Sequence, residues 1–317
     1  CPAPTLIAFL LSCNRHWGVD MPPRVIPPDW PYRNASRHVA CPPHLWHVQE
    51  MGTGPILLLI HGAGGATHSF RNLIPLLTGC YRIIVLDLPG QEFTTLGARS
   101  RCGLEAMAQD IAALCKQEHW DPYAVIGHSA GAAIALRLMQ IRPAKAAVGI
   151  NAALGKFEGA AGWVFPILAR FLAVTPLVSQ MFSKLVGTPR QVKRLLESTG
   201  SHIDAAGQAQ YLYLMSQPNH LAGTLAMMSQ WDVDALMQSL PHQTNPCLLI
   251  TGSKDLAVPP DVSERAAAQR PDCRWLNVKG FGHLIHEEAA EAVSQLILSF
   301  LEELVSRKSV ERGGAPT

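Results

Sequence analysis

Six short segments of the chain are apolar at almost every position, where a half-buried strand would alternate apolar with polar residues. Such continuous runs predict strands that are covered on both faces, as in a parallel sheet between two layers of helices. The runs span residues 56–60, 82–87, 123–127, 146–150, 247–251 and 275–278, and a further strand is expected at 46–49.

Apolar residues at helical spacing fall between these runs. They repeat every three or four positions over residues 104–114, 134–141 and 289–304, which predicts amphipathic helices. Alternation of strands and helices on this scale indicates an open, doubly wound, mostly parallel α/β sheet. Nearly a hundred residues after the fourth run are helical in pattern, and we interpret them as a cap inserted over the carboxyl edge of the sheet, where such folds bind ligands.

These patterns divide the 317 residues into a core, a cap and two ends. The core is expected at 21–151 and 231–306, the helical cap at 152–230, and a disordered tail at 307–317. Residues 1–20 are interpreted as an upstream or disordered segment before Met21, with a truncated signal peptide as the alternative. The longest apolar run, 161–169, is less than half of a membrane span, so no integral membrane segment is expected.

Composition narrows the classes of function. With 48% apolar and 16% charged residues the chain has material for a core and is not largely disordered. A net charge of +2 provides no basic field, so no nucleic-acid partner is expected. None of the eight cysteines forms a CxxC pair or has zinc-finger spacing, which predicts scattered reduced thiols and no bound metal.

The first chemical signal is Gly127-His128-Ser129-Ala130-Gly131, which follows an apolar strand and opens a helical stretch. Small residues around a serine in this pattern allow the sharp strand-to-helix turn that exposes the hydroxyl group. Because a serine hydroxyl is a weak nucleophile until a base takes its proton, a histidine is required. Ser129 is therefore the candidate nucleophile.

His283 and Asp255 are the matching candidates for the base and its carboxylate. His283 lies in a glycine-flanked loop after the last strand, whereas His286 is expected near a helix start, in a solvent-facing or capping role. Asp255 leaves a buried strand, and a helix begins shortly after it. The order Ser129, Asp255, His283 is that of the α/β-hydrolases and differs from the orders in chymotrypsin and subtilisin.

Backbone amides are needed to stabilise a developing oxyanion. We expect them from Ala130, directly after the nucleophile, and from Ala63 in the loop 61–65. His61 is expected to order that loop. The alternative for this glycine-rich loop is a phosphate cradle, but it lacks the Lys-Ser/Thr ending of a P-loop and the spacing of a dinucleotide fingerprint.

The cap suggests a roomy apolar pocket with a basic rim, suited to a large, flat, anionic molecule. Its residues 152–230 carry six basic side chains against three acidic ones, together with several aromatic residues and methionines. The pocket is expected to include His128, Trp163, Phe165 and Trp231, although the side chain of His128 should point away from Ser129. No cofactor is expected.

The chain resembles the magnesium-chelatase accessory protein family of bacteriochlorophyll biosynthesis, which has the α/β-hydrolase fold. One departure from common hydrolases is Gly90-Gln91-Glu92, where Gly-His-Gly is frequent. The resemblance covers nearly the whole chain after Met21 and is carried by residues 29–31, 36–37, 46–49, 128–133, 151–154, 199–201, 227–232 and 282–288.

This resemblance implies a role in (bacterio)chlorophyll biosynthesis near magnesium insertion, with a tetrapyrrole as small-molecule substrate, magnesium chelatase as partner, and a cytoplasmic location peripheral to photosynthetic membranes. One hypothesis is a serine hydrolase acting on an ester or related acyl bond. The second is a non-catalytic chelatase accessory or porphyrin-binding protein. A third is a haloperoxidase-like or carbon–carbon bond hydrolase that shares the triad.

Overall fold

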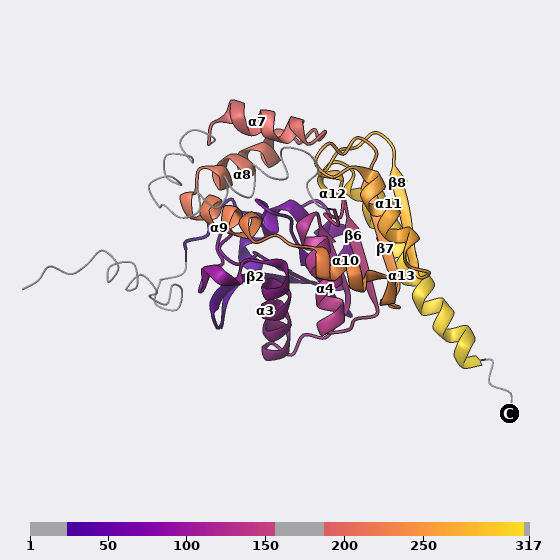
Figure 1. The fold of residues 1–317 in the computed structure, drawn as a ribbon. Helices are drawn as coiled ribbons and strands as arrows, with labels where there is room; N and C mark the ends of the chain where they lie inside the picture. Colours follow the sequence, from indigo (N-terminus) through magenta and orange to yellow (C-terminus); the bar gives the residue numbers. More distant parts are fainter. Residues whose placement is uncertain (1–23, 156–186, 314–317) are drawn as a thin grey trace, which may run out of the picture.

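The computed structural model describes residues 24–155 and 187–313, with side chains up to Ser306 (Figure 1). The described residues form an eight-stranded sheet in the order β1-β2-β4-β3-β5-β6-β7-β8. The strands are β1 (Ser36–Cys41), β2 (His44–Met51), β3 (Ile56–Ile60), β4 (Arg82–Leu86), β5 (Pro122–His128), β6 (Ala146–Ile150), β7 (Cys247–Gly252) and β8 (Cys273–Val278).

Strand direction follows the predicted pattern. The pairs β1–β2 and β2–β4 are antiparallel, and every other neighbouring pair is parallel. Each predicted strand is present, and the α/β prediction is confirmed. β1 is not among the predicted strands, because this edge strand mixes polar and apolar residues and only Val39 and Cys41 on it are buried.

Helices cover both faces of the sheet (Figure 1). On β3, Leu58 and Ile60 join one apolar cluster, while Leu57 and Leu59 join the cluster on the opposite face. Burial of such a leucine side chain contributes about 2 kcal/mol to stability. The first cluster includes residues of α3 (Leu104–Gln117), α4 (Ala130–Ile141), α10 (Asp234–Ser239) and α11 (Pro260–Ala268), and the second includes α2 (Ile74–Leu77) and α13 (Ala290–Gly313).

All the regular elements that the structure describes between β6 and β7 are helices. Helices α7 (Pro189–Ser198), α8 (Ala205–Met215) and α9 (Pro218–Ser229) lie together above the sheet in Figure 1. Thr188 and Asp204 cap α7 and α8 by accepting bonds from backbone amides in the first turn. These helices agree with the interpretation of a cap, whose outer boundaries remain a prediction.

The carboxyl end of the chain departs from its prediction. A disordered tail was expected from Arg307, but α13 continues to Gly313. Arg307, Lys308, Glu311 and Arg312 have good helix propensity, and extending an existing helix costs little compared with starting one. Across the described ranges 24–155 and 187–313, we find no helix with the length and hydropathy of a membrane span.

The remaining elements are short. They are the 3-10 helices η1 (Arg33–Ala35), η2 (Thr67–Phe70), η3 (Arg99–Arg101) and η4 (Leu240–His242), and one helical turn, α12 (Ile285–Glu288).

Candidate active site

Ser129 occupies a sharp turn between β5 and α4. Its φ of 53° and ψ of −119° lie in a region that non-glycine residues rarely adopt. The turn is crowded, because a Cβ atom on Gly127 would lie 2.2 Å from the carbonyl oxygen of Gly131, and one on Gly131 would lie 2.2 Å from that of Ile60. The small residues on both sides of Ser129 are therefore needed for this strained turn.

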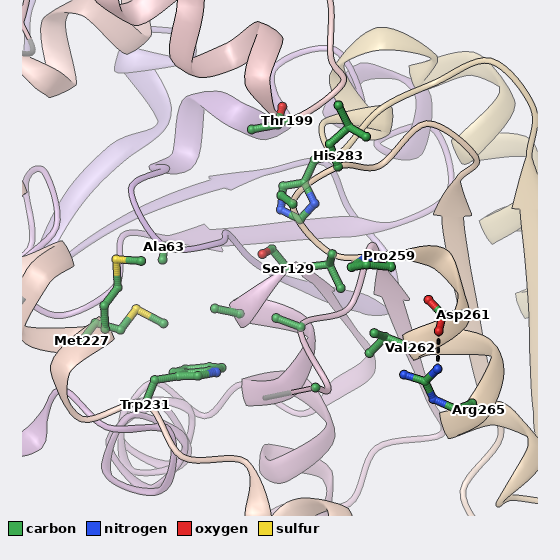
Figure 2. Close-up of a pocket in the computed structure, with 17 residues that line it drawn as sticks. Ala63, Ser129, Thr199, Met227, Trp231, Pro259, Asp261, Val262, Arg265 and His283 are labelled. Carbon is green, nitrogen blue, oxygen red and sulfur yellow. Dashed lines mark hydrogen bonds and ion pairs between the residues drawn. The ribbon is translucent and has the colours of Figure 1, made fainter. Parts of the chain in front are cut away.

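Asp255 and His283 meet at the carboxyl ends of β7 and β8. The Nδ1 atom of His283 lies 2.8 Å from Oδ2 of Asp255, and Figure 2 shows the imidazole projecting toward Ser129. With Nδ1–H donating to the carboxylate, Nε2 is the basic nitrogen of this ring. The structure therefore brings together the three residues that the chain order singled out.

The carboxylate of Asp255 is surrounded by donors. Its Oδ1 accepts bonds from the amides of Ala257 and Val258, each at 2.8 Å. Its Oδ2 accepts from His283 and from the side-chain amide of Asn151, at 2.6 Å. These bonds compensate the loss of hydration of a nearly fully buried charge.

Asn151 is a site residue that the sequence argument did not assign. It directly follows β6 with a φ of 47°, and its side chain also donates to the carbonyl of Gly282 and accepts from the amide of Gly252. The available signal was an asparagine directly after a buried strand, since asparagine tolerates left-handed backbone. Its partners are about a hundred residues away along the chain, so spacing could not reveal them.

Ala63 and Ala130 both line the same pocket as Ser129 and His283, and their role as oxyanion donors remains a prediction. The loop that carries Ala63 packs against the turn, because a Cβ atom on Gly62 would lie 2.9 Å from Cβ of Ser129. His61 orders this loop, as predicted. Its Nδ1 donates to the carbonyl of Gly62, and its Nε2 accepts from the amide of Leu88.

The turn Gly90-Gln91-Glu92, which departs from the frequent Gly-His-Gly, is hydrogen-bonded to the 61–65 loop. Gln91 accepts a bond from the amide of Gly64 at 2.9 Å. The Nδ1 atom of His220 accepts from the amide of Glu92, and its Nε2 donates to the carbonyl of Gly64. Cap helix α9, which carries His220, is therefore tied to both the 61–65 loop and the 90–92 turn.

The pocket above Ser129 has a volume of about 660 Å³. Figure 2 shows Ser129 between an apolar end, with Met227 and Trp231, and an end with the ion pair of Asp261 and Arg265. The lining is formed by Ala63, Ser129, Ala130, Ala153, Gly155, Thr199, Met227, Met228, Trp231, Leu256, Ala257, Val258, Pro259, Asp261, Val262, Arg265 and His283.

Of the four residues expected in the substrate pocket, Trp231 lines it. Trp163 and Phe165 lie outside the described residues. His128 does not line the pocket, and that expectation was wrong, because its ring packs in the interior against the rings of His283 and His286. There, its buried Nε2 donates to the carbonyl of His283 at 2.9 Å.

The expectation for His286 was also wrong. Its side chain is fully buried against the rings of His128 and Phe70, and neither ring nitrogen has a hydrogen-bond partner among the described residues. Burial, reinforced by the neighbouring His283 and Arg71, lowers the pKa of His286 to about 3. Helical spacing alone could not show that this turn packs inward.

A basic rim is not visible in the described lining. The only basic side chain besides His283 in this described lining is Arg265, which comes from the core and is paired with Asp261. Arg190, Lys193 and Arg194 on α7 do not line it. In the described parts of the chain, we find no group of three histidine, cysteine, aspartate or glutamate side chains placed to hold a metal ion.

Comparisons with known proteins place the chain in a family. Residues 55–290 match the family model described as the alpha/beta hydrolase fold. The magnesium-chelatase 30 kDa subunit of Rhodobacter capsulatus is 46% identical over 284 residues, 89% of this chain and all of that protein. A pimeloyl-[acyl-carrier protein] methyl ester esterase of Xanthomonas oryzae pv. oryzae is 25% identical, covering 80% of this chain and 98% of the esterase.

Solved structures agree on the fold. The solved structure of the epoxide hydrolase CorEH superposes with a TM-score of 0.72 at 20% identity, covering 85% of this chain and 99% of that chain. The chain therefore belongs to the α/β-hydrolase family and, within it, to the family of the magnesium-chelatase 30 kDa subunit.

Proposed function

We propose that the protein is a serine hydrolase that cleaves an ester or a related acyl bond. The observation that carries this proposal is the strained backbone of Ser129 in one pocket with His283, whose ring is hydrogen-bonded to Asp255. A positive φ at a serine costs free energy that an ordinary turn residue would avoid. The same turn exposes the hydroxyl to the imidazole, which is the arrangement that nucleophilic catalysis needs.

In the first half of the reaction, Oγ of Ser129 attacks the acyl carbon while Nε2 of His283 takes its proton. Asp255 holds the imidazole in the required tautomer and stabilises the positive charge that forms on it. His283 then gives the proton to the leaving alcohol, and an acyl-enzyme remains. In the second half, a water molecule loses its proton to His283 and attacks the acyl carbon. The bond between that carbon and Oγ of Ser129 then breaks, His283 returns the proton to Oγ, and the acid is released.

On this proposal, the negative charge on the carbonyl oxygen develops next to the amides of Ala63 and Ala130, two residues that line the pocket. Amides that are already oriented stabilise the tetrahedral intermediate without reorganisation during the reaction. Gln91 and His220 hold the 61–65 loop through Gly64. This support fits a loop whose backbone must stay in place while charge develops.

The chain offers a matched control for the nucleophile. Ser36 also takes part in a hydroxyl–imidazole–carboxylate chain, with its Oγ 3.0 Å from Nε2 of His47, whose Nδ1 lies 2.7 Å from Asp87. Ser36, however, begins β1 and does not line the pocket. We expect hydrolysis of a panel of p-nitrophenyl esters by the wild type and by Ser36→Ala, and its loss in Ser129→Ala. Hydrolysis that persists in Ser129→Ala, or none from the wild type, would contradict the proposal.

We further propose that this activity serves (bacterio)chlorophyll biosynthesis near the magnesium-chelatase step, on a tetrapyrrole ester. The 46% identity to the magnesium-chelatase 30 kDa subunit supports the pathway, and the relationship to a methyl ester esterase supports the bond type. The apolar end of the pocket, with Met227, Met228 and Trp231, suits a flat hydrophobic body.

The second candidate function is a non-catalytic chelatase accessory or porphyrin-binding role, which the name of the same relative favours. Complementation of a deletion strain separates the two. Full pigment synthesis with Ser129→Ala would make catalysis dispensable and favour the accessory role. Loss of pigment with folded Ser129→Ala, and rescue with Ser36→Ala, would favour the hydrolase.

A further inference from the structure

Three cap residues at the end of α7 lie between the two loops that carry Asp255 and His283. We call this segment, Thr199–Gly200–Ser201, the cap clasp. The carbonyl oxygen of Thr199 accepts a bond from the amide of Leu256 and another from the amide of His283, each at 3.2 Å. One atom of the cap therefore links the backbones of both loops.

Gly200 brings the cap backbone into direct contact with these loops. Its φ is +80°, and a Cβ atom there would lie 1.9 Å from the carbonyl oxygen of Lys254. On the other side, a Cβ atom on Gly282 would lie 2.2 Å from the carbonyl carbon of Gly200. Glycine is required on both sides of this contact, because any side chain would push the cap away from the loops.

Ser201 and Glu288 complete the connection. Ser201 is fully buried, and its Oγ accepts from the amide of Leu284 at 2.8 Å. Glu288 joins the cap to the loop that carries His283. One of its carboxylate oxygens accepts a bond from the amide of His202 at 2.7 Å, and the other accepts from the amide of Gly282 at 3.0 Å.

We propose that the cap clasp is a positioning element that sets where the His283 imidazole sits relative to Ser129. The backbone of His283 is held at its amide by Thr199 and at its carbonyl by His128, and the next amide is held by Ser201. This inference rests on the proposed hydrolase function. Its mechanism is geometric, since a displacement of about 1 Å at a reacting group can cost about a hundredfold in rate.

Ser201→Ala removes the acceptor of the buried Leu284 amide, and Ser198→Ala is the matched control. Ser198 is the last residue of α7, three positions before Ser201; it is exposed, and its hydroxyl donates to the carbonyl of Leu195. For reaction with a fluorophosphonate, we expect kinact of Ser201→Ala to fall about tenfold, because a buried amide without its acceptor lets the backbone next to His283 shift. KI should stay within about twofold, and Ser198→Ala should match the wild type.

Hydrogen exchange and NMR test the positioning itself. In Ser201→Ala we expect the amides of 283–285 to exchange about tenfold faster, and the low-field NMR signal of the proton between His283 and Asp255 to shift or broaden. Neither should change in Ser198→Ala. If Ser201→Ala does not fold, Glu288→Gln carries the same test, with the exposed Glu291→Gln as its control.

The experiments distinguish failure of the proposed hydrolase function from failure of the positioning role. A wild type that does not react with the fluorophosphonate would overturn the proposed function, while the exchange and NMR comparison would still decide the positioning role. A folded Ser201→Ala with the kinact, exchange and NMR signal of Ser198→Ala would overturn the positioning role alone. Loss of kinact with an unchanged NMR signal and unchanged exchange would also overturn it.

Discussion

Glu92 is predicted to make the stability of the fold depend on pH in a direction opposite to that of most carboxylates. Burial, together with the charge of Asp87, raises the pKa of Glu92 from its usual 4.5 to about 8, although Arg24 and Tyr213 oppose the shift. Its Oε2 has no hydrogen-bond partner among the described residues and lies 3.7 Å from Nδ1 of His220. The folded protein therefore favours the neutral acid at this position.

The sign follows from proton linkage. Because the folded state binds this proton more tightly than the unfolded state, the stabilising contribution is fully present below pH 4.5 and is lost as pH rises to about 8. Each pH unit in that window corresponds to about 1.4 kcal/mol. Between pH 5 and pH 7 the free energy of unfolding of the wild type should therefore fall by about 3 kcal/mol relative to a variant with a permanently neutral side chain.

Glu92→Gln is that variant, since its amide has nearly the shape of the protonated carboxyl group. Urea denaturation followed by circular dichroism at pH 5, 6 and 7 gives the difference between the two proteins, in which other titrating groups largely cancel. The exposed Glu197→Gln on α7 is the control and should follow the wild type at every pH. Parallel stability curves for Glu92→Gln and the wild type would refute the reasoning.

Three further predictions test the site and the core. Asp255→Asn should slow fluorophosphonate labelling about 10³-fold, because an amide cannot stabilise the imidazolium; labelling near the wild-type rate would contradict the proposed role. Asn151→Gly should lower the free energy of unfolding by about 1–3 kcal/mol, because the hydrogen bonds of the asparagine side chain are lost. Asn151→Ala should lower it by about 1 kcal/mol more, because alanine is strained at the φ of 47°. Equal stability of these two variants in urea denaturation would count against a backbone role. In the same assay, Leu58→Ala in β3 should lower the free energy of unfolding by about 2–5 kcal/mol. Leu195 is half-exposed, so Leu195→Ala should change this free energy by no more than about 0.5 kcal/mol. Similar losses of stability in the two variants would be inconsistent with the core described.

The sheet could be predicted because its central strands are short, apolar on both faces and bounded by glycine or proline, which together indicate buried strands. The triad candidates could be predicted for a related reason. In a parallel sheet, residues that directly follow different strands converge on one edge, and Ser129, Asp255 and His283 all follow strands. The pairing of His283 with Asp255 is confirmed, and their catalytic role remains a prediction.

The supporting residues could not be predicted in the same way. Asn151, Gln91 and Ser201 act through partners that are 27 to 131 residues distant in sequence. Side-chain type and local spacing carry no record of such contacts, which exist only once the chain has folded. The prediction of a solvent-facing or capping role for His286 was wrong for a related reason. A short helical turn has too few positions to show which of its faces is buried.

The central claim is that Ser129 is a nucleophile, and the site of covalent modification tests it most directly. After reaction with a fluorophosphonate, intact-protein and peptide mass spectrometry should find one adduct per chain, on the peptide that contains Ser129. The adduct should form in Ser36→Ala and be absent from Ser129→Ala. An unmodified wild type, or an adduct on another serine, would contradict the account.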